Sequence, residues 1–156
     1  MNELTIEERA VNNETYQHIS RVRELLNQSI VDLLRRGEQH DQSKLSPPEV
    51  STFAEYTPKL ADSVYGSEEY KTFLSEMKPA LDHHYANNRH HPEHHVAGIS
   101  GMTLIDLIEM LCDWKAASER HKTGDVSRSI DLNTTRFDLS DQLRTILHNT
   151  ATAWSQ

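Results

Sequence analysis

Apolar residues recur at helical spacing along most of the chain, and no stretch shows the strict alternation that is typical of strands. The pattern predicts a first helix over residues 14–36, with Asn13 as its cap and Gly37 at its end. The segment before it, about 1–12, is expected to be an N-terminal arm. The apolar stripe of this helix contains Val22, Leu25, Leu26, Leu33 and Leu34.

The tetrapeptide "SPPE" resembles the start of a second helix. Ser46 is suited to cap it, Pro47 to occupy its first position, and Glu49 to reach back in a capping box. This predicts a helix over residues 47–56. The following "TPKLADSVYGS", residues 57–67, reads as irregular linkage.

The second half of the chain predicts further helices. One begins at Ser67 and is broken or kinked at Pro79. Residues 101–120 form the most apolar segment and are expected to be the centre of the protein. A polar turn around Gly124 precedes a last amphipathic helix near 139–153. The helix after Ser67 has one face with Tyr70, Phe73, Leu74, Met77, Leu81 and His84.

The length of 156 residues suits one domain, so the expectation is an all-α, single-domain helical bundle over residues 1–156. No apolar run approaches the length of a spanning helix, and "MNELTIEERAV" lacks the features of a secretory signal. Cys112 is the single cysteine, which favours a reducing compartment and a cytoplasmic protein. Because its segment is apolar, Cys112 is expected to pack in the core.

The net charge of −8 argues against a nucleic-acid polymer as partner, since no basic stripe offsets it. Small phosphorylated substrates remain compatible, because bound divalent cations reverse the local field of a pocket. The sequence does not determine the oligomeric state; a homodimer stays open as the commonest assembly.

Candidate metal ligands occur in several segments. His40 and Asp41 are adjacent, and both can bind one ion if the backbone turns sharply between them. His18 shares the stripe of the first helix, where a hydrogen-bonded core histidine is the alternative. Asp113 lies in the most apolar segment, where burial of a carboxylate requires compensation. The alternatives there are a salt bridge with a nearby base, or a solvated acidic stripe that includes Asp106 and Glu109.

Residues 83–95, "HHYANNRHHPEHH", contain six histidines. His84 lies on the apolar face of its helix and is favoured over His83 as a ligand. His91 precedes Pro92 and is therefore expected in an extended bend, with His90 or His94 as substitutes. The alternative is an exposed polar loop, above all for His95. Arg89 is expected either to meet a phosphate or to lie in solvent.

The ordered set His18, His40–Asp41, Asp113 resembles the HD-domain superfamily of metal-dependent phosphohydrolases, whose pattern is H…HD…D on an all-α bundle. "HDQSK" looks like the "HDxxK" form of that superfamily, which implies that Lys44 holds substrate phosphate. Members with two metals add histidines in the interval that His84 and His91 occupy here, and some carry a glutamate four residues before the first histidine, as Glu14 does. "NRHHPEHH" and "EMLCDWKAAS" also look like a small family of uncharacterised bacterial and phage proteins.

The resemblance implies one or two divalent ions (Mn, Fe, Zn, Co or Mg), and the short spacing within the histidine cluster leaves their number open. The metal ligands would be His18, His40, Asp41, His84, His91 and Asp113. Lys44 and Arg89 would hold phosphate oxygens, and Glu109 would relay protons. The implied reaction is hydrolysis of a small phosphorylated substrate, a nucleotide above all, by a metal-bound hydroxide. The alternatives are a di-iron oxidoreductase and a non-catalytic metal-binding regulatory module.

Overall fold

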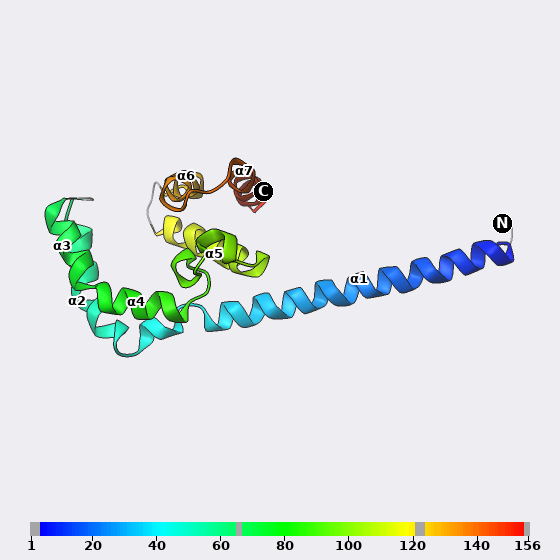
Figure 1. The fold of residues 1–156 in the computed structure, drawn as a ribbon, viewed down its shortest axis with the longest axis horizontal. Helices are drawn as coiled ribbons and strands as arrows, with labels where there is room; N and C mark the ends of the chain where they lie inside the picture. Colours follow the sequence, from blue (N-terminus) through cyan, green and yellow to red (C-terminus); the bar gives the residue numbers. More distant parts are fainter. Residues whose placement is uncertain (1–3, 65–66, 121–123, 155–156) are drawn as a thin grey trace. The chain divides into compact units, whose positions relative to one another are not determined.

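The computed structural model describes residues 4–64, 67–120 and 124–154. These ranges contain helices and turns and no strand. The all-α prediction is therefore confirmed. The chain divides into two units, Met1–Glu38 and Gln39–Gln156. Figure 1 shows the order of the helices along the chain.

Helix α1, Ile6–Gln39, makes up most of the first unit and ends one residue past it, and the helix extends beyond the predicted bounds at both ends. A capping box begins it: the Thr5 hydroxyl accepts from the Glu8 amide at 3.2 Å, and the Glu8 carboxylate accepts from the Thr5 amide at 2.7 Å. The predicted cap Asn13 and the predicted stop Gly37 both lie inside the helix. A glycine inside a helix costs only about 1 kcal/mol, so Gly37 does not end it.

The second unit contains the other six α-helices and three short 3-10 turns of the described ranges. They are η1 (Gln42–Leu45), α2 (Glu49–Asp62), α3 (Glu68–Glu76), α4 (Lys78–Asn87), η2 (Pro92–His94), η3 (Gly98–Gly101), α5 (Leu104–Glu119), α6 (Val126–Phe137) and α7 (Asp141–Ala153).

Three sequence predictions need correction. Helix α2 continues to Asp62, through Pro58, where an irregular segment was expected. Its Glu49 does not reach back to Ser46; its side chain instead lies against α4. Helix α6 was missed because its sequence, "VSRSIDLNTTRF", is mostly polar and carries a narrow apolar stripe.

The start of α3, the break near Pro79 and the extents of α5 and α7 agree with the sequence. Ser67 caps α3 by accepting from the Tyr70 amide, and Pro79 lies in the first turn of α4. Thr103 and Asp106 form the capping box that begins α5.

The core lies among α5, α6 and α7. Ile130 of α6 is 0% exposed, and Met110 and Leu111 of α5 are 1% exposed. The rest of this core is Leu139, Leu147 and Ala151. Helices α2, α3 and α4 pack against one another, with Met77 and Ala80 buried. Both groups of helices support the segments that carry the histidines and acids described below.

Within the described ranges, no helix combines the length and the apolar character that crossing a membrane requires.

Candidate metal centre

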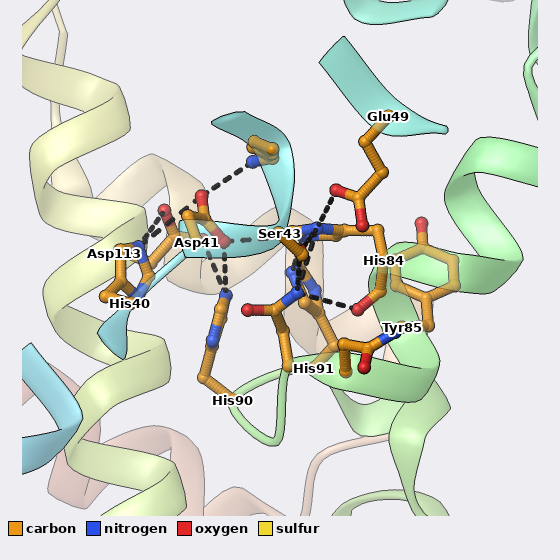
Figure 2. A network of polar contacts seen from close by, with 12 residues as sticks. His40, Asp41, Ser43, Glu49, His84, Tyr85, His90, His91 and Asp113 are labelled. Carbon is orange, nitrogen blue, oxygen red and sulfur yellow. Dashed lines mark hydrogen bonds and ion pairs between the residues drawn. The ribbon is translucent and has the colours of Figure 1, made fainter. Parts of the chain in front are cut away.

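A sharp backbone turn presents His40 and Asp41. Helix α1 ends at Gln39, and Asp41 adopts a left-handed conformation with φ 56° before η1 begins at Gln42. Aspartate tolerates this region better than most residues, because its short side chain bonds locally. The turn sends the neighbouring imidazole and carboxylate toward the same cluster of polar groups (Figure 2). A sharp turn at this position is the condition under which the adjacent His40 and Asp41 can bind one ion together.

Four side chains from three segments form the first group of potential ligands: Asp41, His84, His90 and His91. His84 Nε2 lies 2.9 Å from His91 Nε2 and 3.4 Å from Asp41 Oδ1. His90 Nε2 lies 3.6 Å from the same Asp41 oxygen. We call this set the four-donor group.

The spacing and chemistry of the four-donor group fit a divalent ion. A tetrahedral zinc with bonds near 2.0–2.1 Å separates its donors by about 3.3 Å, and the three separations above, 2.9, 3.4 and 3.6 Å, bracket that value. Asp41 Oδ1 and His90 Nε2 are buried without a hydrogen-bond partner among the described residues. A buried acceptor without a donor is costly, and a bound cation removes that cost.

A second group, His40, Asp41 and Asp113, lies on the other oxygen of the Asp41 carboxylate. His40 Nε2 is 3.6 Å from Asp41 Oδ2 and 3.8 Å from Asp113 Oδ1. These side chains are partly exposed, whereas His84 and His90 are buried. We call this set the three-donor group. Asp41 belongs to both groups through different oxygens, so it is suited to bridge two ions.

Glu109 of α5 supports both groups from behind. Its Oε1 lies 3.0 Å from His40 Nδ1 and 3.1 Å from His90 Nδ1. The far nitrogen of each ring is then directed toward Asp41. The contact with His40 is a hydrogen bond, and a carboxylate in that position fixes the tautomer of a metal-binding histidine. The contact with His90 is an ion-pair distance alone, because His90 Nδ1 has no hydrogen-bond partner among the described residues. The acids of α5 are therefore not a solvated stripe: Glu109 and Asp106 are both buried.

Two histidines of the four-donor group, His84 and His91, are held neutral. Burial lowers the pKa of His91 to about 3, with further lowering by His90 and His84. Burial, followed by the charge of Lys44, also lowers the pKa of His84. Neutral imidazole is the form that binds metal. The environment thus provides lone pairs at neutral pH.

The three-donor group has the opposite electrostatics. The nearby carboxylate of Asp113 and then the hydrogen-bonded carboxylate of Glu109 raise the pKa of His40 to about 10. Burial alone would raise the pKa of Asp113, but the neighbouring His40 lowers it below its usual range. Burial likewise opposes ionisation of Asp41, yet Lys44 and then His40 lower its pKa. Without a metal, protonated His40 is itself the cation that stabilises the carboxylates of Asp41 and Asp113.

Lys44 and Arg89, the two predicted phosphate contacts, differ in surroundings. Lys44 Nζ lies 2.7 Å from Asp41 Oδ2 and 5.5 Å from the centre of the Phe53 ring, at the edge of the three-donor group. Arg89 donates through Nε and Nη2 to the buried carboxylate of Asp106, at 3.2 and 3.1 Å. This pairing ties Arg89 to the start of α5, and its contact with phosphate stays a prediction.

His18 and Glu14, the remaining predicted site residues, lie on α1 in the first unit, and their side chains are exposed. All the ligand groups found among the described residues come from the second unit. The structure therefore brings together His40, Asp41, His84, His91 and Asp113 without His18, whose role stays a prediction.

Sequence reasoning underrated two residues and misjudged a third. His90 was held as a substitute, yet it is 1% exposed and adjoins both groups. Glu49 was expected to reach back to Ser46 in a capping box, whereas it contacts His83 and His84. Cys112 is exposed rather than packed, because the core face of α5 is formed by other positions.

The other histidines of the cluster bond to the chain itself. His94 Nδ1 lies 2.8 Å from the Tyr85 carbonyl oxygen, and His95 Nε2 lies 2.9 Å from that of Arg89. His83 is 40% exposed. The alternative of an exposed polar loop thus describes only part of the segment 83–95.

Comparison with known proteins identifies a family. Residues 7–153 match the model of the Family of unknown function (DUF5662). No curated protein and no solved structure matches the chain.

Proposed function

The chain belongs to the Family of unknown function (DUF5662), and from its site we propose that it is a metal-dependent phosphohydrolase. The proposed substrate is a small phosphorylated molecule, a nucleotide in the first instance. The observation that carries the proposal is the convergence of two donor groups on the Asp41 carboxylate, with Lys44 beside it. The resemblance of His40–Asp41–Lys44 and Asp113 to the HD pattern also supports it.

Each part of the site has a role in this reaction. A divalent ion, when bound, acidifies a water molecule and offsets the charge of a phosphate ester. Lys44 is placed to hold a non-bridging phosphate oxygen as charge develops. Glu109 keeps the ring of His40 oriented through a hydrogen bond to Nδ1, and the partly exposed three-donor group leaves room for further ligands. Binding of an ion at the three-donor group would displace the proton of His40, and a site with three protein donors is typical of catalytic metals.

The four-donor group favours a second candidate, a non-catalytic metal-binding module. Four protein donors complete a tetrahedral ion, which is typical of structural rather than catalytic zinc. If only this group is loaded, the metal stabilises the fold without chemistry. The number of ions per chain, together with phosphate release, separates the two candidates.

The test compares wild type with Asp41→Asn and, as a control, Asp82→Asn. Asparagine tolerates the left-handed conformation of position 41, and Asp82 is an exposed acid that pairs with Lys78 at 2.6 Å. We expect wild type and Asp82→Asn to bind metal and to release phosphate from nucleotides with at least one of Mn, Fe, Zn, Co or Mg. Asp41→Asn should lose both properties while its helical circular dichroism persists.

Two results would contradict the proposal. Metal-loaded wild type that releases no phosphate with any of these ions would favour the regulatory module. Coloured, iron-loaded protein that is inert toward phosphate esters would favour the oxidoreductase.

A further inference from the structure

Glu49, the first residue of α2, carries a buried carboxylate, and capping of the helix does not explain why it is buried. Its exposed fraction is 0%, and α2 has no side-chain cap bond. Both of its oxygens are used: Oε1 lies 2.7 Å from His83 Nδ1, and Oε2 lies 2.9 Å from His84 Nδ1. An ionised carboxylate away from water is expensive unless its partners compensate it.

The surroundings of His84 determine which of its nitrogens carries the proton. Glu49 is an acceptor only, so His84 must donate to it through Nδ1–H. Asn88 Nδ2 also lies 3.0 Å from His84 Nδ1, but its two hydrogens bond to Ser43 Oγ and to the His84 carbonyl oxygen, each at 2.8 Å. The side-chain amide of Asn88 therefore has no hydrogen left to donate to His84 Nδ1.

With its proton on Nδ1, His84 keeps the lone pair of Nε2 for the four-donor group. That atom lies 3.4 Å from Asp41 Oδ1 and 2.9 Å from His91 Nε2 (Figure 2). The neighbouring His83 lies beyond the groups of potential ligands and is 40% exposed. Glu49 thus links α2 to both His83 and His84, and of these two only His84 belongs to the four-donor group.

We propose that Glu49 is a positioning residue for the metal centre, which fixes the ring and the tautomer of His84 so that Nε2 binds the ion. The inference rests on the proposed function only in requiring that a metal binds. Carboxylates in this position typically contribute roughly 10- to 100-fold to metal affinity. The bond to His83 holds the other carboxylate oxygen of Glu49, Oε1, so the orientation of the carboxylate is fixed from both sides.

The first experiment measures affinity for Zn²⁺ and Co²⁺ by chelator competition in wild type, Glu49→Gln and Glu55→Gln. Glu55 is the matched control, because it lies on the same helix and forms an exposed pair with Lys59 at 2.8 Å. We expect Glu49→Gln to bind roughly 10- to 100-fold more weakly and Glu55→Gln to bind as wild type does. The Co²⁺ absorption of Glu49→Gln should also lose tetrahedral intensity.

Thermal unfolding of the metal-free proteins separates positioning from a merely structural role. Weaker metal binding without a matching loss of metal-free stability supports positioning. Equal affinities of Glu49→Gln and wild type would contradict the role of Glu49 alone. Failure of the wild type to bind either ion would overturn this inference, whereas the proposed function is overturned only if Mn, Fe and Mg also fail to bind.

A second measurement needs no variant and decides the matter if Glu49→Gln does not fold. Nitrogen-15 NMR of metal-free wild type should show the proton of His84 on Nδ1 and Nε2 unprotonated. A proton on Nε2 of His84 would overturn the assignment of Glu49.

Discussion

At the scale of single residues, the site depends on Asp41. Its left-handed backbone ends the first helix, and its two oxygens adjoin two different sets of donors. The sequence indicated the His40–Asp41 pair by its adjacency and His84 by its place on an apolar helix face. It indicated Asp113 because a carboxylate in an apolar segment requires a compensating partner. It did not indicate Glu49 or the central place of His90. Both depend on contacts with residues distant in sequence: His90 meets Asp41 and Asp113, and Glu49 meets a histidine 35 residues away.

Replacing Lys44 tests its contact with phosphate. We expect Lys44→Gln to raise KM for a phosphorylated substrate about 10- to 100-fold, the range of one hydrogen bond to a charged group. Metal content should not change, because Lys44 donates to Asp41 without being a ligand. Lys59→Gln is the matched control, since Lys59 also pairs with a carboxylate and lies over an aromatic ring, 4.4 Å from the centre of Tyr56. Unchanged kinetics in Lys44→Gln would leave Lys44 as a partner of Asp41 alone.

The buried His91 makes the metal-free protein sensitive to acid. Burial lowers its pKa from 6.5 to about 3, so the folded state favours neutral His91. The unfolded chain binds the proton more readily than the folded chain does. The contribution of neutral His91 to the free energy of unfolding is therefore complete above pH about 6.5 and is lost as the pH falls toward 3. Urea unfolding at pH 7 and pH 4.5, in chelator, should show a smaller loss of unfolding free energy in His91→Gln than in wild type. Equal losses in the two proteins would show that His91 is not the cause.

At the scale of elements, the hydrophobic pattern predicted the helices with strong apolar faces. Ser67 marked the start of α3, and the apolar segment 101–120 located α5, which begins at Leu104. The pattern failed where local signals compete. Asn13 resembled a cap, but the reciprocal bonds of Thr5 and Glu8 begin α1 earlier. Residues 57–67 were expected to be irregular, but α2 continues through Pro58 to Asp62, because the loss of one amide bond does not prevent the helix from packing on α3 and α4.

Helix α6 illustrates how a polar helix contributes to a core. Its Ile130 is 0% exposed, whereas Leu132, two positions away on the same helix, is 64% exposed. We expect Ile130→Ala to lower the free energy of unfolding by about 2–5 kcal/mol, since it leaves a cavity among α5, α6 and α7. Leu132→Ala removes similar apolar volume at the surface and should cost less than about 0.5 kcal/mol. Chemical denaturation measures both, and equal costs would contradict the placement of α6.

At the scale of the whole molecule, the fold confirms the all-α class that periodicity predicted, while the division into Met1–Glu38 and Gln39–Gln156 was not foreseen. Periodicity describes single helices and carries no information on how they group. The metal centre belongs to the second unit, where its donors come from the turn after α1, from α4, from the loop at His90 and His91, and from α5. A bound ion would therefore join four segments that are separate in the sequence.

This arrangement predicts that metal removal destabilises the second unit. Binding to the folded state alone adds about 2.7 kcal/mol when the free metal is at a hundredfold excess over Kd. For a unit of this size we expect chelation to lower Tm by roughly 10 °C. Near-UV circular dichroism follows the transition through Trp114, whose ring stacks on Phe137 with centres 6.5 Å apart. Asp41→Asn, which removes the donor common to the four-donor and three-donor groups, should show the lower Tm with or without metal. If chelation of fully loaded wild type leaves Tm unchanged, the ion does not bind the folded state in preference to the unfolded chain, and it does not hold these four segments together.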